Sequence, residues 1–189
     1  CVGEQWQFGK GRSGDIELLR KLGKDNGFEV TGVGTVDAGG MRVSSTRIRE
    51  AIGAGDFNVA HSLLGRSYTV FGTVIEGQKL GRTIGFPTAN LTVHQEQLPP
   101  TGVYAVRATG AGDSWDGVAN LGYRPTVAGG LVKRILEVHL FGLEHEIYGE
   151  ELEVEFVRFI RPEQKFDGVD ALKGQIGKDV ETARQILLT

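Results

Sequence analysis

Apolar residues recur at helical spacing in the first part of the chain. Behind Asp15, isoleucine and leucine residues repeat at short intervals as far as Leu22, and Gly23 follows them. This pattern predicts a short helix that is capped by Asp15 and stopped at Gly23. Residues 28–36 are strand-like, so a helix and a strand of an α/β layer are expected.

The chain begins at Cys1, without a methionine, on residues that resemble the end of a buried strand. We therefore expect the first strand of this layer to end at residues 1–2, and the fold to be entered midway. The first part of the chain is then expected to be the remnant of a larger α/β module.

Two more helices are predicted before residue 66. Hydroxyl groups at residues 44–46 can cap a helix that runs to Ile52 and is ended by Gly53 and Gly55. Asp56 can cap the next helix, and Gly65 follows the last apolar residue of its buried face.

From residue 67 the apolar positions change to a period of two. Strand-length runs bounded by glycine or proline occupy residues 68–76, 102–109, 115–122, 134–141 and 151–160. Such a series predicts an antiparallel barrel or sandwich, and the apolar spacing after Asp167 predicts an amphipathic closing helix. No linker rich in proline, glycine or serine separates the halves, so we expect closely packed domains at residues 1–66 and 67–189.

Composition restricts the class of protein. The chain has 189 residues, 40% hydrophobic and 24% charged, which is enough for a folded core and argues against disorder. A sequence pI near 5.8 and the lack of charge blocks argue against a partner that is nucleic acid or an anionic membrane. With Cys1 as its only cysteine and no long apolar run, the chain is expected to be cytoplasmic.

A glycine-rich segment follows the first predicted strand of the second half. Gly77, Gly81 and Gly85 are spaced by four, so the backbone can turn sharply and present N–H groups to phosphate oxygens. Lys79 and Arg82 would add positive charge. The segment matches neither a Walker A loop nor a dinucleotide-binding fingerprint, and from glycine spacing alone an ordinary long hairpin loop remains the alternative.

The end of this glycine-rich segment contains side chains that could bind a metal ion. Pro87 fixes its own backbone, and Thr88 and Asn90 lie two positions apart, so their side chains point to one side of an extended chain. A hydroxyl and an amide oxygen are hard neutral donors. They suit a Mg²⁺ ion that keeps waters and substrate phosphates as its other ligands.

In the predicted strand at residues 134–141, core residues lie on one face and candidate catalytic residues on the other. Leu136, Val138 and Leu140 share the face expected to be buried, and Glu137 and His139 share the other. Glu137 could accept a proton from a substrate hydroxyl, as a carboxylate does in phosphoryl transfer to an alcohol. The alternative is an exposed charge on the outer face of a sheet.

The connection at residues 161–166 combines charge with an aromatic ring. Arg161, Lys165 and Phe166 could cover a ligand between the last strand and the closing helix. A solvated connector is the alternative.

In combination these motifs resemble a known family. Residues 67–189 resemble the riboflavin kinase domain throughout, and residues 1–66 resemble the second half of the FMN adenylyltransferase module that precedes it in bacterial bifunctional riboflavin kinase/FAD synthetases. The kinase motifs are Gly77 to Asn90, Gly102-Val103-Tyr104, residues 117–126, Leu136 to Leu140, Tyr148-Gly149, residues 161–166 and a final helix with Asp179. The adenylyltransferase signals are Val2 to Gly9 and Ser44 to Arg49.

The resemblance implies a fold and a set of roles. The fold is a six-stranded Greek-key antiparallel β-barrel with a C-terminal helix, following a Rossmann-like nucleotidylyltransferase remnant. The reaction is phosphoryl transfer from ATP with Mg²⁺ to riboflavin, giving FMN, with Glu137 as the base for the ribityl 5′-hydroxyl. By resemblance, ATP is bound by Gly77, Gly81, Arg82, Gly85, Pro87, Thr88 and Tyr148, Mg²⁺ by Thr88 and Asn90, and the flavin by Arg161 and Phe166.

The adenylyltransferase half departs from its family. By resemblance its residues are Gly3, Gln5, Thr46 and Arg49, but Gln5 stands where aspartate or asparagine is usual. The His-x-Gly-His motif of that family is absent from this chain. FAD synthesis is therefore expected of the full-length protein and not of this chain alone, and a helix cap with a solvated arginine is the alternative for Thr46 and Arg49.

Two other classes compete with a kinase. A barrel that holds FMN or FAD without turning it over would need neither a metal pair nor a base, so Thr88, Asn90 and Glu137 favour the enzyme. An oligonucleotide-binding barrel would need basic strands with exposed aromatic residues. The acidic positions Glu151, Glu153 and Glu155 on one strand face would instead repel a phosphate backbone.

Overall fold

The structure is a computed structural model that describes residues 1–77, 80–95, 97–125 and 132–188. Lys79 and Thr126 therefore lie outside the described residues. The chain forms two compact units, residues 1–45 and 46–189, which are described separately. Residues 46–66, which the sequence pattern grouped with the first domain, belong to the same compact unit as the barrel.

The first unit is a small α/β layer. Strand β1 (Val2–Gly3) pairs in parallel with β2 (Gly32–Val33), and α1 (Ile16–Asn26) connects them. The unit also holds the 3-10 turn η1 (Lys10–Arg12) and the antiparallel pair β3 (Asp37–Ala38) and β4 (Met41–Arg42). This arrangement confirms the predicted α/β character.

Helix α1 begins as predicted but ends later. The Asp15 carboxylate accepts a hydrogen bond from the Leu18 backbone N–H at 2.9 Å, as an N-cap does. The helix passes through Gly23 and stops at Gly27, whose φ of 76° is left-handed. Gly23 is needed for packing, because a Cβ there would lie 2.5 Å from the Phe28 carbonyl oxygen. The strand predicted at residues 28–36 was also too long, since regular pairing is confined to β2.

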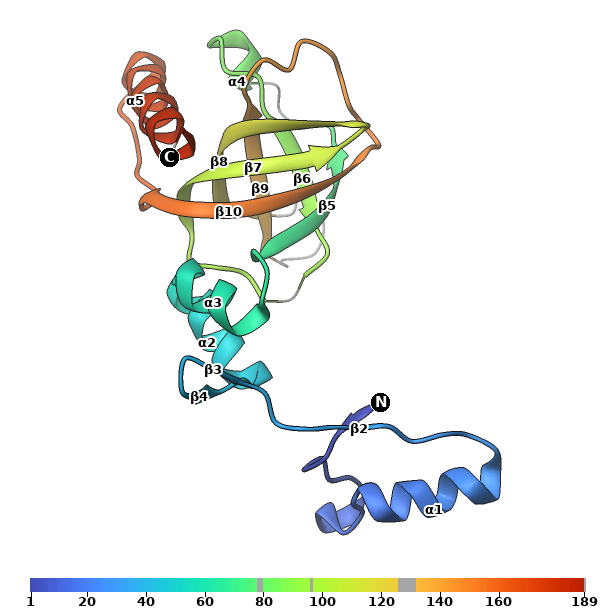
Figure 1. Ribbon diagram of the computed structural model, residues 1–189. Coiled ribbons are helices and arrows are strands. Elements are labelled where there is room, and N and C mark those ends of the chain that lie inside the picture. Colours follow the sequence, from blue (N-terminus) through green and yellow to red (C-terminus); the bar gives the residue numbers. More distant parts are fainter. Residues whose placement is uncertain (78–79, 96, 126–131, 189) are drawn as a thin grey trace. The chain divides into compact units, whose positions relative to one another are not determined.

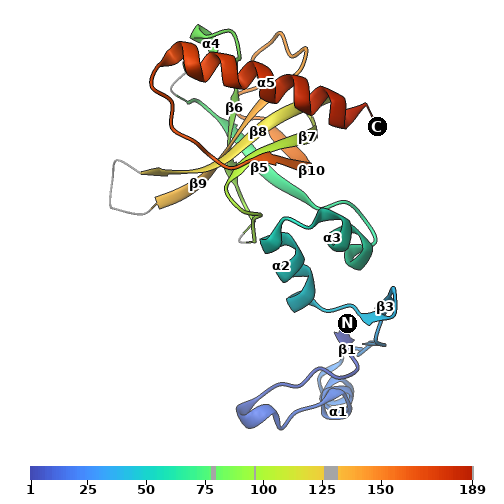
Figure 2. The same cartoon turned by 90° about the vertical axis from the view of Figure 1, so that its left-hand side faces the viewer.

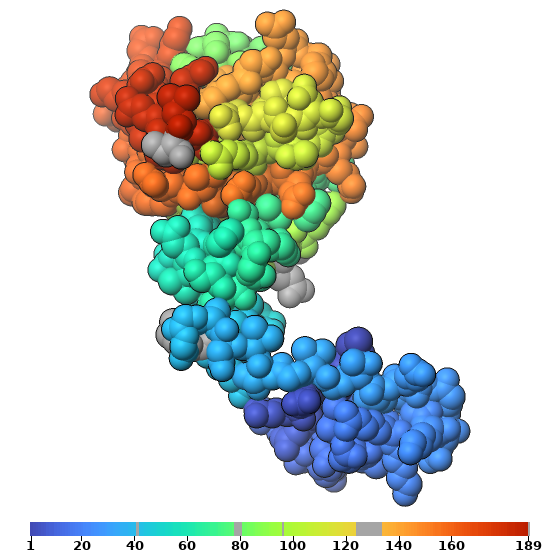
Figure 3. Space-filling view, viewed as in Figure 1, coloured from blue at the N-terminus to red at the C-terminus, as the bar shows by residue number. Residues whose placement is uncertain are grey.

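Helices α2 (Ser45–Ala54) and α3 (Phe57–Leu64) confirm two predicted helices; Gly55, with a left-handed φ of 72°, follows the end of α2 as predicted, whereas Gly53 lies inside it. The Asp56 carboxylate accepts from the Val59 N–H at 3.0 Å, and Gly65 ends α3 with a φ of 70°. Both helices pack against the barrel (Figure 3). The Phe57 ring joins them to the barrel core by stacking on Phe156 at a centroid distance of 5.8 Å.

The rest of the second unit is a closed six-stranded antiparallel barrel (Figure 1). Around the barrel the strands follow the order β10-β5-β6-β9-β8-β7, so β6 lies beside β9 and not beside β7, which follows it in sequence. The strands are β5 (Thr69–Ile75), β6 (Ala89–Val93), β7 (Gly102–Gly110), β8 (Asp113–Pro125), β9 (Val132–Leu140) and β10 (Glu151–Arg161). The predicted antiparallel barrel is confirmed.

Periodicity alone missed one of these strands. In β6, Ala89, Leu91 and Val93 do alternate with Asn90 and Thr92, but the strand has only five residues and directly follows the glycine-rich segment, with which it was grouped. The inward positions of its neighbour β9 follow the rule, because Leu136, Val138 and Leu140 are all buried. A short helical turn, α4 (Leu80–Thr83), interrupts the glycine-rich loop that precedes β6.

Helix α5 (Val169–Leu187) confirms the predicted closing helix. It lies on the outside of the barrel against β7, β8 and β10 (Figure 2). Ala183 and Leu187 are buried there with Val103, Ala105 and Val118. Of the helices in the described ranges, none combines the length and apolar character that crossing a bilayer would require.

Two buried phenols predict a loss of stability at alkaline pH. Burial raises the pKa of Tyr68 and of Tyr104 to about 12, and each hydroxyl donates to a backbone carbonyl at 2.5 Å, those of Gln97 and Pro100. The neutral phenols are favoured in the folded state, so their contribution is fully present below about pH 10 and is lost as pH rises through about 12. We expect the free energy of unfolding, measured in urea, to fall over this range.

The variant Tyr68→Phe provides the comparison. It removes one titrating hydroxyl, so the decline in unfolding free energy between about pH 10 and 12 should be shallower than in the parent chain. Equal slopes for the two proteins would mean that Tyr68 does not contribute to the alkaline transition.

Candidate active site

The register of the barrel gathers polar side chains from several strands on one outer face. Glu137 of β9 lies directly opposite Asn90 of β6 on one side and Asn120 of β8 on the other. Asn120 is opposite Val103 of β7, which is opposite Arg161 of β10. Paired residues of neighbouring strands point to the same face of a sheet. The row from Asn90 to Arg161 therefore faces outward, toward α5 and the connecting loops.

A cavity of about 280 Å³ lies over this row. It brings together six of the eleven residues predicted for the kinase site, namely Gly81, Thr88, Asn90, Glu137, Arg161 and Phe166. Apolar side chains supply much of the remaining lining, namely Ile84, Phe86, Val103, Val118, Leu172 and Ile176. The half-buried Glu137 thus faces a partly apolar cavity, which favours the chemical interpretation over an ordinary surface charge.

A second cavity, of about 350 Å³, contains three more of the predicted nucleotide residues, whereas Gly77 and Gly85 line neither cavity. Arg82, Pro87 and Tyr148 line it, together with apolar residues that include Val74, Leu140, Leu143 and Ile147. Thr88 lines both cavities. The arrangement suits two substrates that meet beside Thr88.

The donor set at the end of the glycine-rich loop fits Mg²⁺. Asn90 is only 5% exposed, and its Oδ1 has no hydrogen-bond partner among the described residues. A buried amide oxygen without a partner is costly, and a hard cation would satisfy it. The described ranges hold no cluster of three or more His, Cys, Asp or Glu side chains suited to a metal.

Two glycines allow the loop to pack against this donor pair. A Cβ on Gly77 would overlap the Asn90 side chain. One on Gly81 would overlap the Phe86 carbonyl oxygen and come within 3.2 Å of the Thr88 Oγ1. Gly85 has another role, because its φ of 90° is strained for any other residue.

The structure adds two contacts that the sequence did not indicate. The His139 Nδ1 lies 2.8 Å from the Pro87 carbonyl oxygen, so a proton on Nδ1 donates to the loop and ties it to β9. The Asn120 Nδ2 donates to the Glu163 Oε1 at 3.2 Å and ties the segment after β10 to the barrel. Pro87 and Glu163 lie in loops outside the strands, so these partners are identified only by the folded course of the loops over the barrel.

Arg82 is paired in this structure. Its Nη2 lies 2.7 Å from the Glu146 Oε1, and both side chains are exposed. The hydrogen bond with Glu146 raises the pKa of the Arg82 guanidinium, which remains a cation in any case. Arg82 is therefore held at the edge of the second cavity, where a nucleotide phosphate would compete with Glu146.

Comparison with known proteins decides the family. The riboflavin kinase family model matches residues 64–187. The chain belongs to the riboflavin kinase family. A second model, for FAD synthetase, matches residues 1–47 and agrees with the α/β remnant.

Relatives of the family share most of this chain. A bifunctional riboflavin kinase/FMN adenylyltransferase from Escherichia coli K12 is 45% identical over 98% of the chain. A protein of the same name from Haemophilus influenzae is 47% identical over 97% of the chain. The chain spans 59% of the length of each. A solved structure from Streptococcus pneumoniae, described as a macrolide-efflux protein, matches with a TM-score of 0.75 at 34% identity, over 97% of this chain and 60% of that one.

The predicted adenylyltransferase residues are divided between the two compact units. Gly3 and Gln5 lie at and just after β1 in the first unit, and Gln5 is exposed. Thr46 and Arg49 are exposed on α2 in the second unit. Their joint role in this family's second activity stays a prediction.

Proposed function

We propose that the chain transfers the γ-phosphoryl group of ATP to the 5′-hydroxyl of the ribityl chain of riboflavin, forming FMN. The observation that carries the proposal is that one cavity is lined by both Glu137 and Asn90, and that the buried Oδ1 of Asn90 has no hydrogen-bond partner among the described residues. A carboxylate can take the proton of an alcohol, and a neutral oxygen donor can hold a metal beside it. Together these groups suit phosphoryl transfer to a hydroxyl.

Each cavity then has a substrate. The first cavity, with Phe166 and the apolar lining from β7, β8 and α5, would hold the flavin so that its ribityl hydroxyl reaches Glu137. The second cavity, with Arg82 and Tyr148, would hold the nucleotide. Thr88 and Asn90 would bind Mg²⁺, which when bound offsets the negative charge of the phosphates. Since ATP is a cytoplasmic substrate, we place the reaction in the cytoplasm.

A flavin-binding barrel without activity explains the site less well. Such a protein would gain nothing from a buried amide oxygen that lacks a partner, because this costs stability unless a ligand satisfies it. It would likewise have no use for a carboxylate placed opposite that amide on the neighbouring strand. Both features are expected of a catalyst.

Incubation of this chain with riboflavin, ATP and Mg²⁺, followed by chromatography of the flavins, tests the proposal. We expect FMN without FAD, because the histidine motif of the adenylyltransferase family is absent from this chain. FAD as a product would show that the first unit retains activity. A folded chain that binds riboflavin but forms no FMN would favour the flavin-binding barrel.

A further inference from the structure

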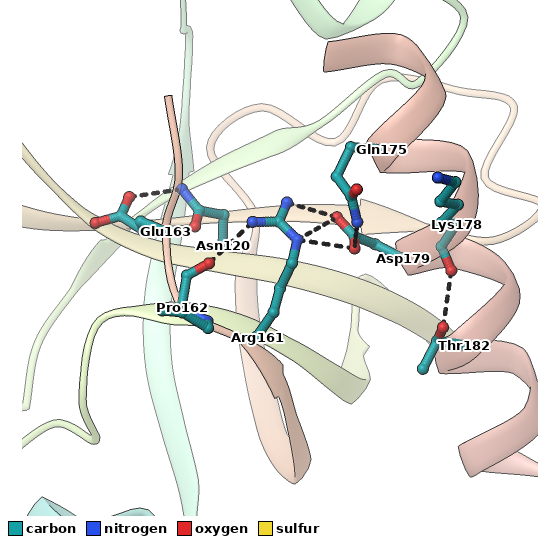
Figure 4. Close-up of polar contacts among 8 residues, drawn as sticks. All are labelled: Asn120, Arg161, Pro162, Glu163, Gln175, Lys178, Asp179 and Thr182. Carbon is teal, nitrogen blue, oxygen red and sulfur yellow. Dashed lines mark hydrogen bonds and ion pairs between the residues drawn. The ribbon is translucent and has the colours of Figure 1, made fainter. Parts of the chain in front are cut away.

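The segment that follows β10 is held by a buried ion pair. Arg161, the last residue of β10, donates from Nε to Asp179 Oδ1 at 2.9 Å and from Nη2 to Asp179 Oδ2 at 2.6 Å (Figure 4). Gln175, one helical turn earlier on α5, donates to the same Oδ1 at 2.9 Å. The Asp179 carboxylate is therefore held by Gln175 at one oxygen and by Arg161 at both.

In this geometry the positive charge of the Arg161 guanidinium is already paired with Asp179, so little of it is available to a ligand. Asp179 is 4% exposed and the Arg161 side chain 16% exposed, and Nη1 donates to the Pro162 carbonyl oxygen at 2.9 Å. A buried bidentate pair of this kind is directional and neutral overall. Arg161 thus links the end of β10 to α5 and is not available as a free cation.

The Arg161–Asp179 ion pair lies next to residues that line the first cavity. The Arg161 Cζ lies 5.8 Å from the centre of the Phe166 ring, and Glu163 is tied to Asn120 of β8. Arg161, Glu163 and Phe166 all line the first cavity. One wall of that cavity is therefore a connection whose course depends on the contact with Asp179.

We propose that Asp179 is a positioning residue for the flavin substrate. By fixing Arg161, it holds residues 161–166 in the course that shapes the flavin side of the first cavity. This inference rests on the proposed function, since it takes riboflavin as the ligand of that cavity. It assigns Asp179 no contact with the reacting atoms.

A purely structural role is the competing explanation, because the same ion pair also docks α5 on the barrel. Other residues of α5 dock the helix without lining either cavity. Leu187 is 7% exposed and packs in the cluster beneath the helix. Leu187→Ala is thus a matched control, because it weakens the packing of α5 on the barrel and leaves the Arg161–Asp179 ion pair intact.

The test compares Asp179→Asn with Leu187→Ala and the parent chain. For Asp179→Asn we expect the KM for riboflavin to rise on the order of tenfold, with the KM for ATP and kcat changed less than about threefold. The Kd for riboflavin, from quenching of flavin fluorescence, should rise in parallel. For Leu187→Ala we expect a lower Tm and an unchanged riboflavin Kd.

Three outcomes would overturn the inference: an unchanged riboflavin Kd in Asp179→Asn, an equal rise in Leu187→Ala, or no riboflavin binding by the parent chain. Binding without FMN formation by the parent would refute only the proposed function, since the Kd still tests Asp179. If Asp179→Asn does not fold, Gln175→Ala replaces it. That variant keeps the ion pair and loosens the carboxylate, so a rise in Kd of about threefold is expected and an unchanged Kd contradicts the role.

Discussion

Glu137→Gln is expected to fold as the parent chain does and to lose FMN formation by about a hundredfold or more. The amide keeps the size of the side chain but cannot accept the proton of the ribityl hydroxyl. Glu137 lies in the middle of β9, where the flanking Leu136 and Val138 fill the core, so the substitution leaves the inward packing untouched. The measurement is the rate of FMN formation at saturating riboflavin and ATP, with circular dichroism and Tm as checks on folding.

Glu153→Gln supplies the matched control for this change. Glu153 is also a half-buried glutamate on the outer face of a barrel strand, but it lies on β10 outside both cavities. Its substitution removes one negative charge from the barrel and should leave the rate within about twofold. Near-normal turnover in Glu137→Gln, or an equal loss in Glu153→Gln, would remove Glu137 from the mechanism.

The location of Glu137 shows what the sequence could predict of this site. Alternation along residues 134–141 predicted the strand and which residues face the core, and the structure confirms both. It could not tell a catalytic carboxylate from a solvated one, because that depends on what lies opposite. Asn120 stands opposite Glu137 because the consecutive strands β8 and β9 pair, whereas Asn90 does so because β9 also pairs with β6, from which it is separated in sequence by β7 and β8. Such cross-strand pairs join residues distant in sequence, and no local pattern records them.

Two elements illustrate where local pattern misleads. Strand β6 was missed although Ala89, Leu91 and Val93 alternate with Asn90 and Thr92, because it is short and Asn90 was grouped with the glycine-rich segment that precedes it. Gly23 was taken for a stop because glycine is common after a helix, whereas it serves the close approach of the Phe28 backbone. In both cases tertiary contacts assign the residue its role.

The role of Asp179 could not be predicted from its position in the sequence, for a different reason. The resemblance to the kinase family included it as part of the final helix, and an acidic residue on an amphipathic helix predicts only a solvated position. Burial to 4% and the bidentate contact with Arg161 become visible once α5 is docked on the barrel. A charged residue that is nearly fully buried needs a partner, and the partner indicates its role.

Asn90→Ala is expected to reduce FMN formation by about a hundredfold while changing the free energy of unfolding by no more than about 1 kcal/mol. The small cost in stability follows from the unpartnered Oδ1, since removing a buried polar atom without a hydrogen bond relieves a penalty that offsets the lost packing against Gly77. The large cost in rate follows because the same oxygen would be a ligand of Mg²⁺. The measurements are turnover as a function of Mg²⁺ concentration and unfolding in urea.

Thr92→Ala is the control for this pair of measurements. Thr92 lies two positions further along β6, hence on the same face of the same strand, and lines neither cavity. Its truncation should leave turnover and the Mg²⁺ requirement unchanged. If Asn90→Ala instead lost about 3 kcal/mol of stability and kept its turnover, Asn90 would be a structural residue. A fall in turnover with a higher Mg²⁺ requirement and intact stability would identify it as a metal ligand. Loss of a residue that only supports the fold would lower turnover and stability together.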